Sequence, residues 1–346
     1  MKEEATPIWY LVEDETRRAC KRLDPVKIVR DVLVLHADAE VQLPAEAYLG
    51  WTSPAGSAAR SLNMPGYIGG GYEMPGTKII NACLGNPDHG LPRASGLTLL
   101  FDRHTARITC MMASAHISAL RTASVTVACA QTLLAGKVIT AGVIGAGAIG
   151  QTHIELLARS VPGLAYVAVY DQDLSRAQLL AERLSRSLRQ HGVRIEAADS
   201  AQSAVFGADL VVPATTAVQG YIEYSWLSRG AVVVNVSLDD LKPEAILQAD
   251  SLLVDDWSLV SADTHRILGR MFRDGLVVGP GQKAKPGGRA VDAELGQVFA
   301  GRHPGRHRPE DIVVVNPFGM AIEDVALAAE VYRVAIREGR GIPLPR

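Results

Sequence analysis

A glycine-rich turn between an apolar run and a helical stretch is the feature that most limits how this chain can fold. Residues 138–144 form an apolar β-run that leads directly into Gly145-Ala146-Gly147-Ala148-Ile149-Gly150. The stretch 151–157 has the composition of a helix, and Asp171 ends the next β-run, about 20 residues after the last glycine. This order of strand, glycine turn, helix and acid predicts a Rossmann-type dinucleotide-binding domain.

Each position of the turn has a physical role in holding a dinucleotide. Gly145 permits the tight turn, Gly147 lets the backbone approach the pyrophosphate, and Gly150 lets helix and strand pack closely. The helix N-terminus offers free N–H groups and a positive dipole to the phosphates. Ala148 and Ile149 complete the turn and are included in the predicted cofactor site.

Asp171 and two threonines extend the expected cofactor site. An acid at the end of the second β-run can accept hydrogen bonds from the adenine ribose, and its charge would repel a 2′-phosphate. The sequence therefore predicts NAD in preference to NADP. Thr215 and Thr216 follow the apolar run 210–213, at the strand edge where such a sheet meets its ligand, although a plain strand–loop pair is an open alternative.

Strands and helices alternate after the glycine turn. A helix with Arg, Glu and Gln on its wet face is expected over 175–190. Further strands are expected at 165–170, 209–213, 231–236 and 252–254. Alternation of this kind predicts an α/β fold with a doubly wound parallel sheet.

The residues before the turn have a different character. A helix is expected to begin at Asp24-Pro25, and 44–100 combines frequent Gly and Pro with short apolar runs, which predicts a small, mostly antiparallel sheet. Residues 113–134 contain no Pro and are rich in Ala, Ser, Thr and Leu, which indicates a long buried helix.

A chain of 346 residues favours two domains. A helix at 331–338 is expected to close the chain and pack on the first segment. The expected domains are an α+β substrate-binding and dimerisation domain at 1–117 with 319–346, and an NAD-binding Rossmann domain at 118–318.

Composition excludes several classes of protein. The net charge of −2 gives no basic surface for nucleic acid and no membrane anchor. The four cysteines are scattered without CxxC or zinc spacing, so we expect reduced thiols and no metal site. The N-terminus lacks the apolar stretch of a signal peptide, and no apolar run is long enough to span a membrane. These features predict a cytoplasmic protein.

The position of the glycine turn in mid-chain, directly after a helix containing Leu120-Arg121-Thr122-Ala123, resembles the ornithine cyclodeaminase/mu-crystallin family. The resemblance covers nearly the whole chain. It implies a homodimer formed through the first segment.

Several segments look like the amine-oxidising members of that family, which make 2,3-diaminopropionate. A cyclodeaminase would show Gly-Gly-Asp-Cys-Pro-Gly-Lys-like and Asp-Ser-Val-Gly-like stretches where this chain has 236–240 and 316–319. The segments that carry the resemblance are Arg93-Ala94-Ser95-Gly96, Gly220-Tyr221-Ile222-Glu223-Tyr224, Asn235-Val236-Ser237-Leu238-Asp239-Asp240, Val254-Asp255-Asp256-Trp257, Ala293-Glu294-Leu295-Gly296-Gln297 and Asn316-Pro317-Phe318-Gly319-Met320-Ala321-Ile322-Glu323-Asp324.

Basic residues of the first segment are candidates for binding substrate carboxylates, because Arg binds a carboxylate in a bidentate fork. The resemblance places Arg60, Lys78 and Arg121 on the family's substrate-contacting positions, and we add Arg93. Arg121 stands among apolar and small residues, so it should face a ligand or a fixed anion. A structural salt bridge is the alternative for Arg121, and solvated surface charge is the alternative for the others.

Asp240 is the candidate general base. It follows the expected strand 231–236 and matches the family's catalytic aspartate by register from Asn235. Its neighbour Asp239 leaves open which acid is the base. The resemblance also suggests a catalytic part for Lys78 and a cofactor contact for Ser237.

The resemblance implies NAD-dependent oxidation of N-(2-amino-2-carboxyethyl)-L-glutamate, a small amino-acid-derived substrate. The products would be L-2,3-diaminopropionate, 2-oxoglutarate and NADH, for siderophore or peptide-antibiotic biosynthesis. One alternative is an ornithine or lysine cyclodeaminase or an imine reductase. Another is a non-catalytic binding protein of the mu-crystallin type, although a hydrophobic ligand would not need several cationic groups.

Overall fold

The computed structural model describes residues 7–345, which form two compact units. Within the described residues, unit 1 consists of 7–121 with 320–345, and unit 2 consists of 122–319. The boundary between the two units falls within the long helix α3 (Ala115–Leu133). This helix agrees with the one predicted over 113–134.

Unit 1 is built on an eight-stranded mixed sheet. Neighbouring strands in this sheet pair antiparallel, apart from β1 and β7, which pair parallel. The small antiparallel sheet expected over 44–100 is confirmed, and the structure extends it with strands from both ends of the chain. The order is β18 (Ile342–Leu344), β1 (Ile8–Leu11), β7 (Ile108–Ala113), β6 (Ala94–Phe101), β5 (Met74–Cys83), β4 (Ala58–Ile68) and β2 (Val41–Gln42), with β3 (Ala47–Thr52) also paired to β4.

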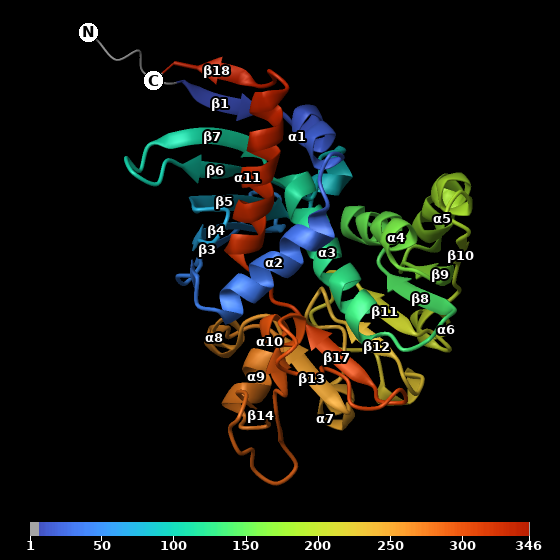
Figure 1. The fold of residues 1–346 in the computed structure, drawn as a ribbon. Coiled ribbons are helices and arrows are strands. Elements are labelled where there is room, and N and C mark those ends of the chain that lie inside the picture. Colours follow the sequence, from blue (N-terminus) through green and yellow to red (C-terminus); the bar gives the residue numbers. More distant parts are fainter. Residues whose placement is uncertain (1–6, 346) are drawn as a thin grey trace. The chain divides into compact units, whose positions relative to one another are not determined.

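Helices α1 (Glu13–Cys20), α2 (Pro25–Ala37) and α11 (Ala321–Arg337) pack in unit 1, where a short 3₁₀ turn also lies at Asn86–His89. Helix α2 begins as predicted, because the Asp24 side chain accepts a hydrogen bond from the Lys27 N–H at 3.0 Å. Helix α11, red in Figure 1, crosses β4, β5 and β6 and contacts α2. It begins ten residues before the expected 331, so its buried first turn belongs to the core of this unit.

Unit 2 is a Rossmann-type domain with a parallel sheet, as predicted. The chain runs from β8 outward through β9 to β10 and then returns to β11 on the other side of β8, which makes the β8–β11 edge the switch point where such sheets bind ligands. The strand order is β10 (Arg194–Ala197), β9 (Leu164–Tyr170), β8 (Ile139–Ile144), β11 (Leu210–Pro213), β12 (Val232–Val234), β17 (Val313–Asn316), β13 (Ser251–Val254) and β16 (Ala293–Glu294).

The connections of unit 2 are helical. They are α4 (Ala148–Ser160), α5 (Leu174–Arg189), α6 (Ala201–Val205), α7 (Pro243–Gln248), α8 (Trp257–Ala262), α9 (Ile267–Arg273) and α10 (Leu295–Phe299), with a 3₁₀ turn at Tyr224–Trp226 and a two-stranded sheet of β14 (Val277–Val278) and β15 (Arg289–Ala290).

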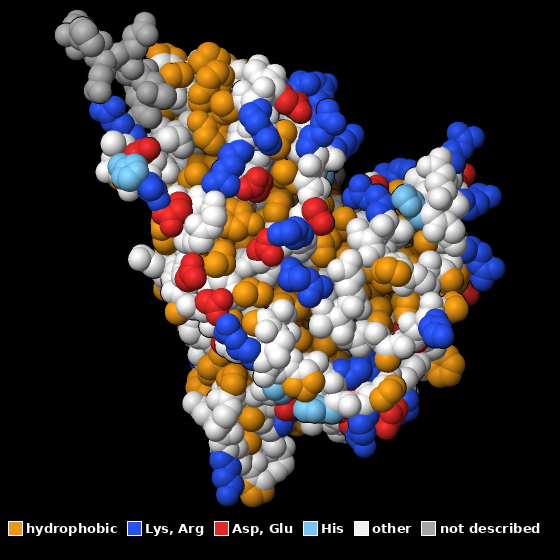
Figure 2. Space-filling view, in the orientation of Figure 1, with side chains coloured by type: hydrophobic (Ala, Val, Ile, Leu, Met, Phe, Trp, Pro, Cys, Tyr) orange, Lys and Arg blue, Asp and Glu red, His pale blue; other side chains and the backbone are white. Residues whose placement is uncertain are grey.

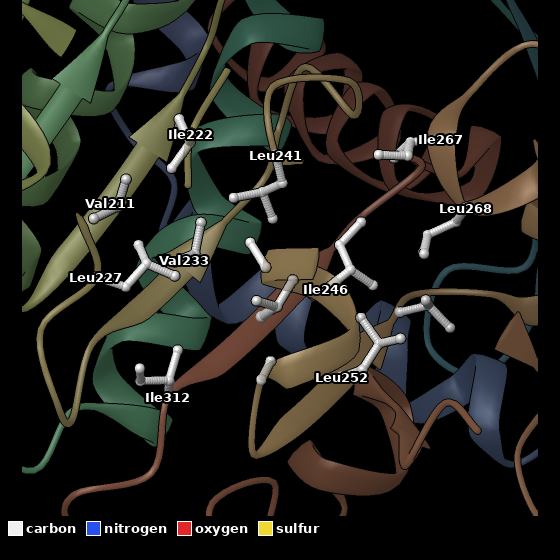
Figure 3. Packing of buried hydrophobic residues seen from close by; sticks show 14 of the residues in the cluster. Val211, Ile222, Leu227, Val233, Leu241, Ile246, Leu252, Ile267, Leu268 and Ile312 are labelled. Atoms are coloured by element: carbon white, nitrogen blue, oxygen red, sulfur yellow. The ribbon is translucent and has the colours of Figure 1, made fainter. Parts of the chain in front are cut away.

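A hydrophobic cluster anchors the loops that follow β11 and β12. Val211 and Val233 point from these strands toward Ile222, Leu241 and neighbouring aliphatic side chains (Figure 3). Ile222 and Leu241 are completely buried and form a parallel β-bridge. The loops that carry residues 221 and 240 are therefore fixed to the core.

On the face drawn in Figure 2, no large patch carries charge of a single sign, because Lys and Arg side chains lie among Asp, Glu and apolar groups. Over residues 7–345, no helix has the length and apolar character needed to cross a membrane. The same residues contain no cluster of three or more His, Cys, Asp or Glu side chains that could hold a metal ion.

His153, in α4, is a buried neutral group of the Rossmann unit. Its Nδ1 donates to the Ile149 carbonyl at 2.8 Å, and its Nε2 accepts from the Thr126 hydroxyl at 3.0 Å. Both ring nitrogens are thus used by the neutral tautomer. Burial lowers the pKa of His153 from 6.5 to about 4.

This pKa predicts a loss of stability in mild acid. The unfolded chain binds a proton at this histidine below pH 6.5, and the folded chain does so only near pH 4, so the free energy of unfolding should fall across that window by about 3 kcal/mol. Urea unfolding of wild type and His153→Gln at several pH values isolates this contribution as the difference between the two curves. Parallel curves would contradict the expectation.

Candidate active site

The glycine turn has the close backbone packing that its sequence predicts. Gly145 has a φ of 106°, and a Cβ there would lie 2.5 Å from the Ala214 carbonyl oxygen at the end of β11. A Cβ on Gly150 would collide with the carbonyl oxygen of Gly145. Both positions therefore require glycine to keep β8, α4 and β11 together.

Gly147 has space beside it for a ligand. It is the N-cap residue of α4, and no side chain caps this helix. A Cβ on Gly147 would have one described neighbour within 4 Å, the Arg176 guanidinium at 3.9 Å. The N–H groups of Ala148 and Ile149 lie in the first turn of this 13-residue helix. An uncapped helix end beside open space fits a pyrophosphate.

Asp171 ties the end of β9 to the glycine turn. Its Oδ2 accepts from the Ala146 N–H at 2.8 Å, and its Oδ1 accepts from the Asp173 N–H at 3.1 Å. The Arg176 guanidinium lies 3.8 Å from Oδ1 and is more than half exposed. Arg176 was not identified from the sequence. Its position in the first turn of the helix that follows Asp171 could have indicated a cation close to that acid.

Asp240 accepts hydrogen bonds from three hydroxyl groups. Oδ1 accepts from Thr215 Oγ1 at 2.5 Å and from the Tyr221 phenol at 3.0 Å, and Oδ2 accepts from Ser237 Oγ. The Thr215 N–H donates to Ser237 Oγ at 3.1 Å, which links the ends of β11 and β12. We call Thr215, Tyr221 and Ser237 the hydroxyl cage. Thr216 is exposed and is outside this network.

Asp239 has a different environment. Its carboxylate accepts from Arg266 Nη1 at 2.8 Å, from Arg270 Nη2 at 3.2 Å and from the Ile267 N–H at 2.8 Å. These contacts make Asp239 the anchor of α9. Of the two adjacent acids, Asp240 is the one that lies beside β11 at the switch point.

Burial governs the acidity of Asp240. Burial raises the pKa of its carboxyl above the usual value, against the lowering effect of the three hydroxyl hydrogen bonds, and the charge of Asp239 adds to the rise. The Tyr221 phenol also has a raised pKa, through burial and the neighbouring Asp240. Asp240 is therefore a stronger base than an exposed aspartate.

Two buried cations and two buried carboxylates meet inside unit 1. Lys78 Nζ donates to Asp324 Oδ2 at 2.7 Å, and Arg121 lies 3.0 Å from Glu323 and 3.3 Å from Asp324. Lys78 is 1% exposed, and burial lowers its pKa. We call these four residues the buried quartet.

The quartet supplies the fixed anions that the sequence analysis allowed for Arg121. It also shows that Lys78 is not a solvated surface charge. Glu323 and Asp324 belong to the segment 316–324 that carries the family resemblance, but neither acid was given a role from the sequence. Two adjacent acids in the first turn of an otherwise apolar helix were the available signal.

Arg60 and Arg93 lie near each other at the ends of β4 and β6. Arg60 pairs with Ala82 of β5, and Ala82 pairs with Ala94, the neighbour of Arg93. Both arginines are half-buried, and burial and then the charge of Arg60 lower the pKa of Arg93. Two cations held this close suit an anionic ligand.

Arg60 and Lys78 share one face of the sheet. Lys78 pairs with Met64, and Met64 is four residues from Arg60 on β4, so all three side chains point to the same side. Helix α11 covers this side, as the contact between Lys78 and Asp324 shows.

A model of the ornithine cyclodeaminase/mu-crystallin family matches residues 24–339. The N-((2S)-2-amino-2-carboxyethyl)-L-glutamate dehydrogenase of Staphylococcus aureus is 32% identical over 321 residues, which are 92% of each chain. The crystal structure of CmnK is 36% identical, with a TM-score of 0.89 and 99% of both chains covered.

A more distant structure has the same fold. The Δ1-pyrroline-2-carboxylate reductase of Thermococcus litoralis, solved with NADH and L-proline, is 23% identical with a TM-score of 0.84, over 97% of this chain and 100% of its own. The resemblance stated from the sequence is thus confirmed. The chain belongs to the ornithine cyclodeaminase/mu-crystallin family.

Proposed function

We propose that this chain is an NAD-dependent oxidoreductase that acts on the CH–NH bond of N-(2-amino-2-carboxyethyl)-L-glutamate. The observation that carries the proposal is the buried Asp240 carboxylate at the switch-point edge of a dinucleotide fold, where a base can serve an amine. Identity of 32% to a dehydrogenase named for this compound supports the choice of substrate.

The cofactor contacts follow from the fold. Gly145, Gly147 and Gly150 admit the pyrophosphate at the start of α4, and Asp171 accepts from the adenine ribose. Residues at the ends of β11 and β12, Thr215 among them, would hold the nicotinamide half. When bound, NAD would supply the acceptor for the hydride that leaves the glutamate Cα.

The residues of unit 1 recognise the carboxylates of the substrate. Arg60 and Arg93 supply adjacent positive charge. In the buried quartet, Glu323 and Asp324 already offset much of the charge of Lys78 and Arg121, so these cations orient a carboxylate more than they attract it.

Asp240 performs the proton chemistry. An ammonium has no lone pair to support loss of the hydride, so the amine must first lose a proton, and a buried carboxylate of raised pKa can accept it. Once Asp240 has released that proton to solvent, its carboxylate can activate the water that hydrolyses the imine to 2-oxoglutarate and L-2,3-diaminopropionate. We assign the reaction to the cytoplasm and to siderophore or peptide-antibiotic biosynthesis.

The test is NADH formation from N-(2-amino-2-carboxyethyl)-L-glutamate, run beside ornithine, lysine and proline-type imines. We expect NADH from the glutamate adduct, with 2-oxoglutarate and 2,3-diaminopropionate in equal amounts. Conversion of ornithine to proline and ammonia, without NADH from the adduct, would favour the cyclodeaminase alternative. A neighbouring gene for a cysteine-synthase-like enzyme would support the pathway.

Cofactor choice gives a second prediction. The Asp171 charge at the ribose should favour NAD over NADP, while Arg176, 3.8 Å away, is the cation that could meet a 2′-phosphate once the acid is removed. Asp171→Ser should therefore reduce the difference between the dissociation constants for NAD and NADP. The double variant Asp171→Ser with Arg176→Ala should reduce that difference less. Calorimetric titration with both cofactors measures this. Tighter binding of NADP by wild type would refute the role of Asp171.

We also predict a homodimer formed through the sheet of unit 1. Leu49 and Trp51 of β3 are 63% and 48% exposed and, with Leu97 of β6, share the sheet face opposite Lys78. Light scattering should give twice the chain mass at micromolar concentration, and Leu49→Glu with Trp51→Glu should give the monomer mass. A wild-type monomer would contradict the prediction.

A further inference from the structure

Tyr221 is held against Asp240 by its backbone as well as by its phenol. The N–H groups of Tyr221 and Ile222 both donate to the Asp240 carbonyl oxygen, at 2.8 and 2.9 Å. A Cβ on Gly220 would collide with the Leu241 carbonyl oxygen, so glycine is needed for the two segments to meet. The position of the phenol therefore depends on the backbone and on the buried cluster beneath it, and not on one side-chain hydrogen bond.

The hydroxyl cage stands between Asp240 and the outside. Asp240 is 0% exposed, whereas Thr215, Tyr221 and Ser237 are each partly exposed. A proton that reaches the carboxylate from a bound molecule therefore passes most directly through one of these hydroxyls. A hydroxyl can do this because it can accept a proton on a lone pair while it donates its own.

Two of the three hydroxyls already accept a backbone hydrogen bond. Thr215 Oγ1 accepts from the Ala217 N–H at 3.0 Å, and Ser237 Oγ accepts from the Thr215 N–H at 3.1 Å. Across the described residues, no backbone N–H donates to the Tyr221 phenol oxygen. The Thr215 side chain also hydrogen-bonds with this phenol. Because no described backbone group donates to it, the phenol oxygen is the member of the cage best able to accept a proton from a ligand.

We propose that Tyr221 relays the proton from the substrate amine to Asp240, an inference that rests on the proposed function. The phenol oxygen accepts the ammonium proton as its own O–H proton passes to Asp240 Oδ1. One N–H bond and one O–H bond break, and two O–H bonds form. The amine becomes neutral with its lone pair free, the phenol is unchanged, and the carboxylate becomes a carboxylic acid.

The test compares Tyr221→Phe with Tyr224→Phe. Both variants lose one hydroxyl group from the same segment, and Tyr224 is outside the hydroxyl cage. We expect Tyr221→Phe to lower kcat about 100-fold or more, with KM and the dissociation constant for NADH within about threefold of wild type. Tyr224→Phe should keep wild-type turnover. Asp240→Asn with Tyr221→Phe should be no slower than Asp240→Asn, because a relay without an acceptor has no effect.

A readout without turnover separates a relay from a structural role. Loss of the phenol donor removes an interaction that lowers the Asp240 pKa, so the carboxyl ¹³C signal of Asp240 should titrate at higher pH in Tyr221→Phe than in wild type or Tyr224→Phe. The acid limb of the kcat profile should move in the same direction.

A measurement on wild type covers the case in which Tyr221→Phe does not fold. The rate of single-turnover NADH formation should be measured in mixtures of H₂O and D₂O. A plot of this rate against the deuterium fraction should be curved, because two protons move in the same step. A linear dependence, or Tyr221→Phe turnover within about threefold of wild type, would overturn the relay while leaving the proposed function intact. Wild type that forms no NADH from the glutamate adduct would instead overturn the proposed function.

Discussion

Asp240→Asn is expected to bind NAD as wild type does and to lose turnover by about two to four orders of magnitude. The amide keeps the size of the carboxylate and can still accept from Thr215 and Tyr221, but it cannot take up a proton from the amine. Cofactor affinity should not change, because the glycine turn and Asp171 do not involve this side chain. NADH fluorescence titration and steady-state kinetics with the glutamate adduct measure the two properties separately.

Asp239→Asn is the matched control, since it makes the same change one residue away. Asp239 is bound by Arg266 and Arg270 and accepts from the first N–H of α9, so its loss should lower stability more than turnover. If Asp240→Asn kept near-wild-type turnover and Asp239→Asn lost it, the base would be Asp239. If both variants lost turnover in proportion to their loss of folded protein, neither acid would be the base.

The parts of the fold that the sequence predicts well are those set by local rules. The glycine turn, the acid after β9 and the apolar runs of β8 and β11 each carry their signal within a few residues, and the structure confirms the Rossmann-type sheet they predict. Strand β17 was not predicted, although it pairs with β12 on one side and β13 on the other, because a run of three valines and an asparagine is too short to show a period.

Sequence reasoning places side chains on elements but does not supply their partners. Arg121 among small apolar residues indicates a buried cation that needs an anion, but its partners lie about 200 residues later, in a helix whose start was expected ten residues too late. Tyr221 shows the same difficulty. Its phenol meets Asp240 because Gly220 lets two loops approach, and no periodicity in the sequence predicts that contact.

The buried quartet predicts the largest change in stability. Asp324→Ala should lower the free energy of unfolding by about 3–5 kcal/mol, because Lys78 would keep a buried charge without its 2.7 Å partner. Part of this loss is recovered if Lys78 gives up its proton, and its pKa is already lowered by burial. The unfolded chain holds that proton at neutral pH, so the deficit relative to wild type should grow as the pH falls from the ordinary lysine pKa of 10.5 toward neutrality.

Urea unfolding across that pH range measures the effect, and two further variants define its origin. Lys78→Met with Asp324→Ala removes cation and anion together and should be more stable than Asp324→Ala, since no isolated charge remains on β5. Lys27→Ala breaks an exposed ion pair with Asp31 and should unfold at nearly the wild-type urea concentration. A deficit that did not vary with pH, or a double variant less stable than Asp324→Ala, would mean that packing around α11, rather than the charge of Lys78, sets the cost.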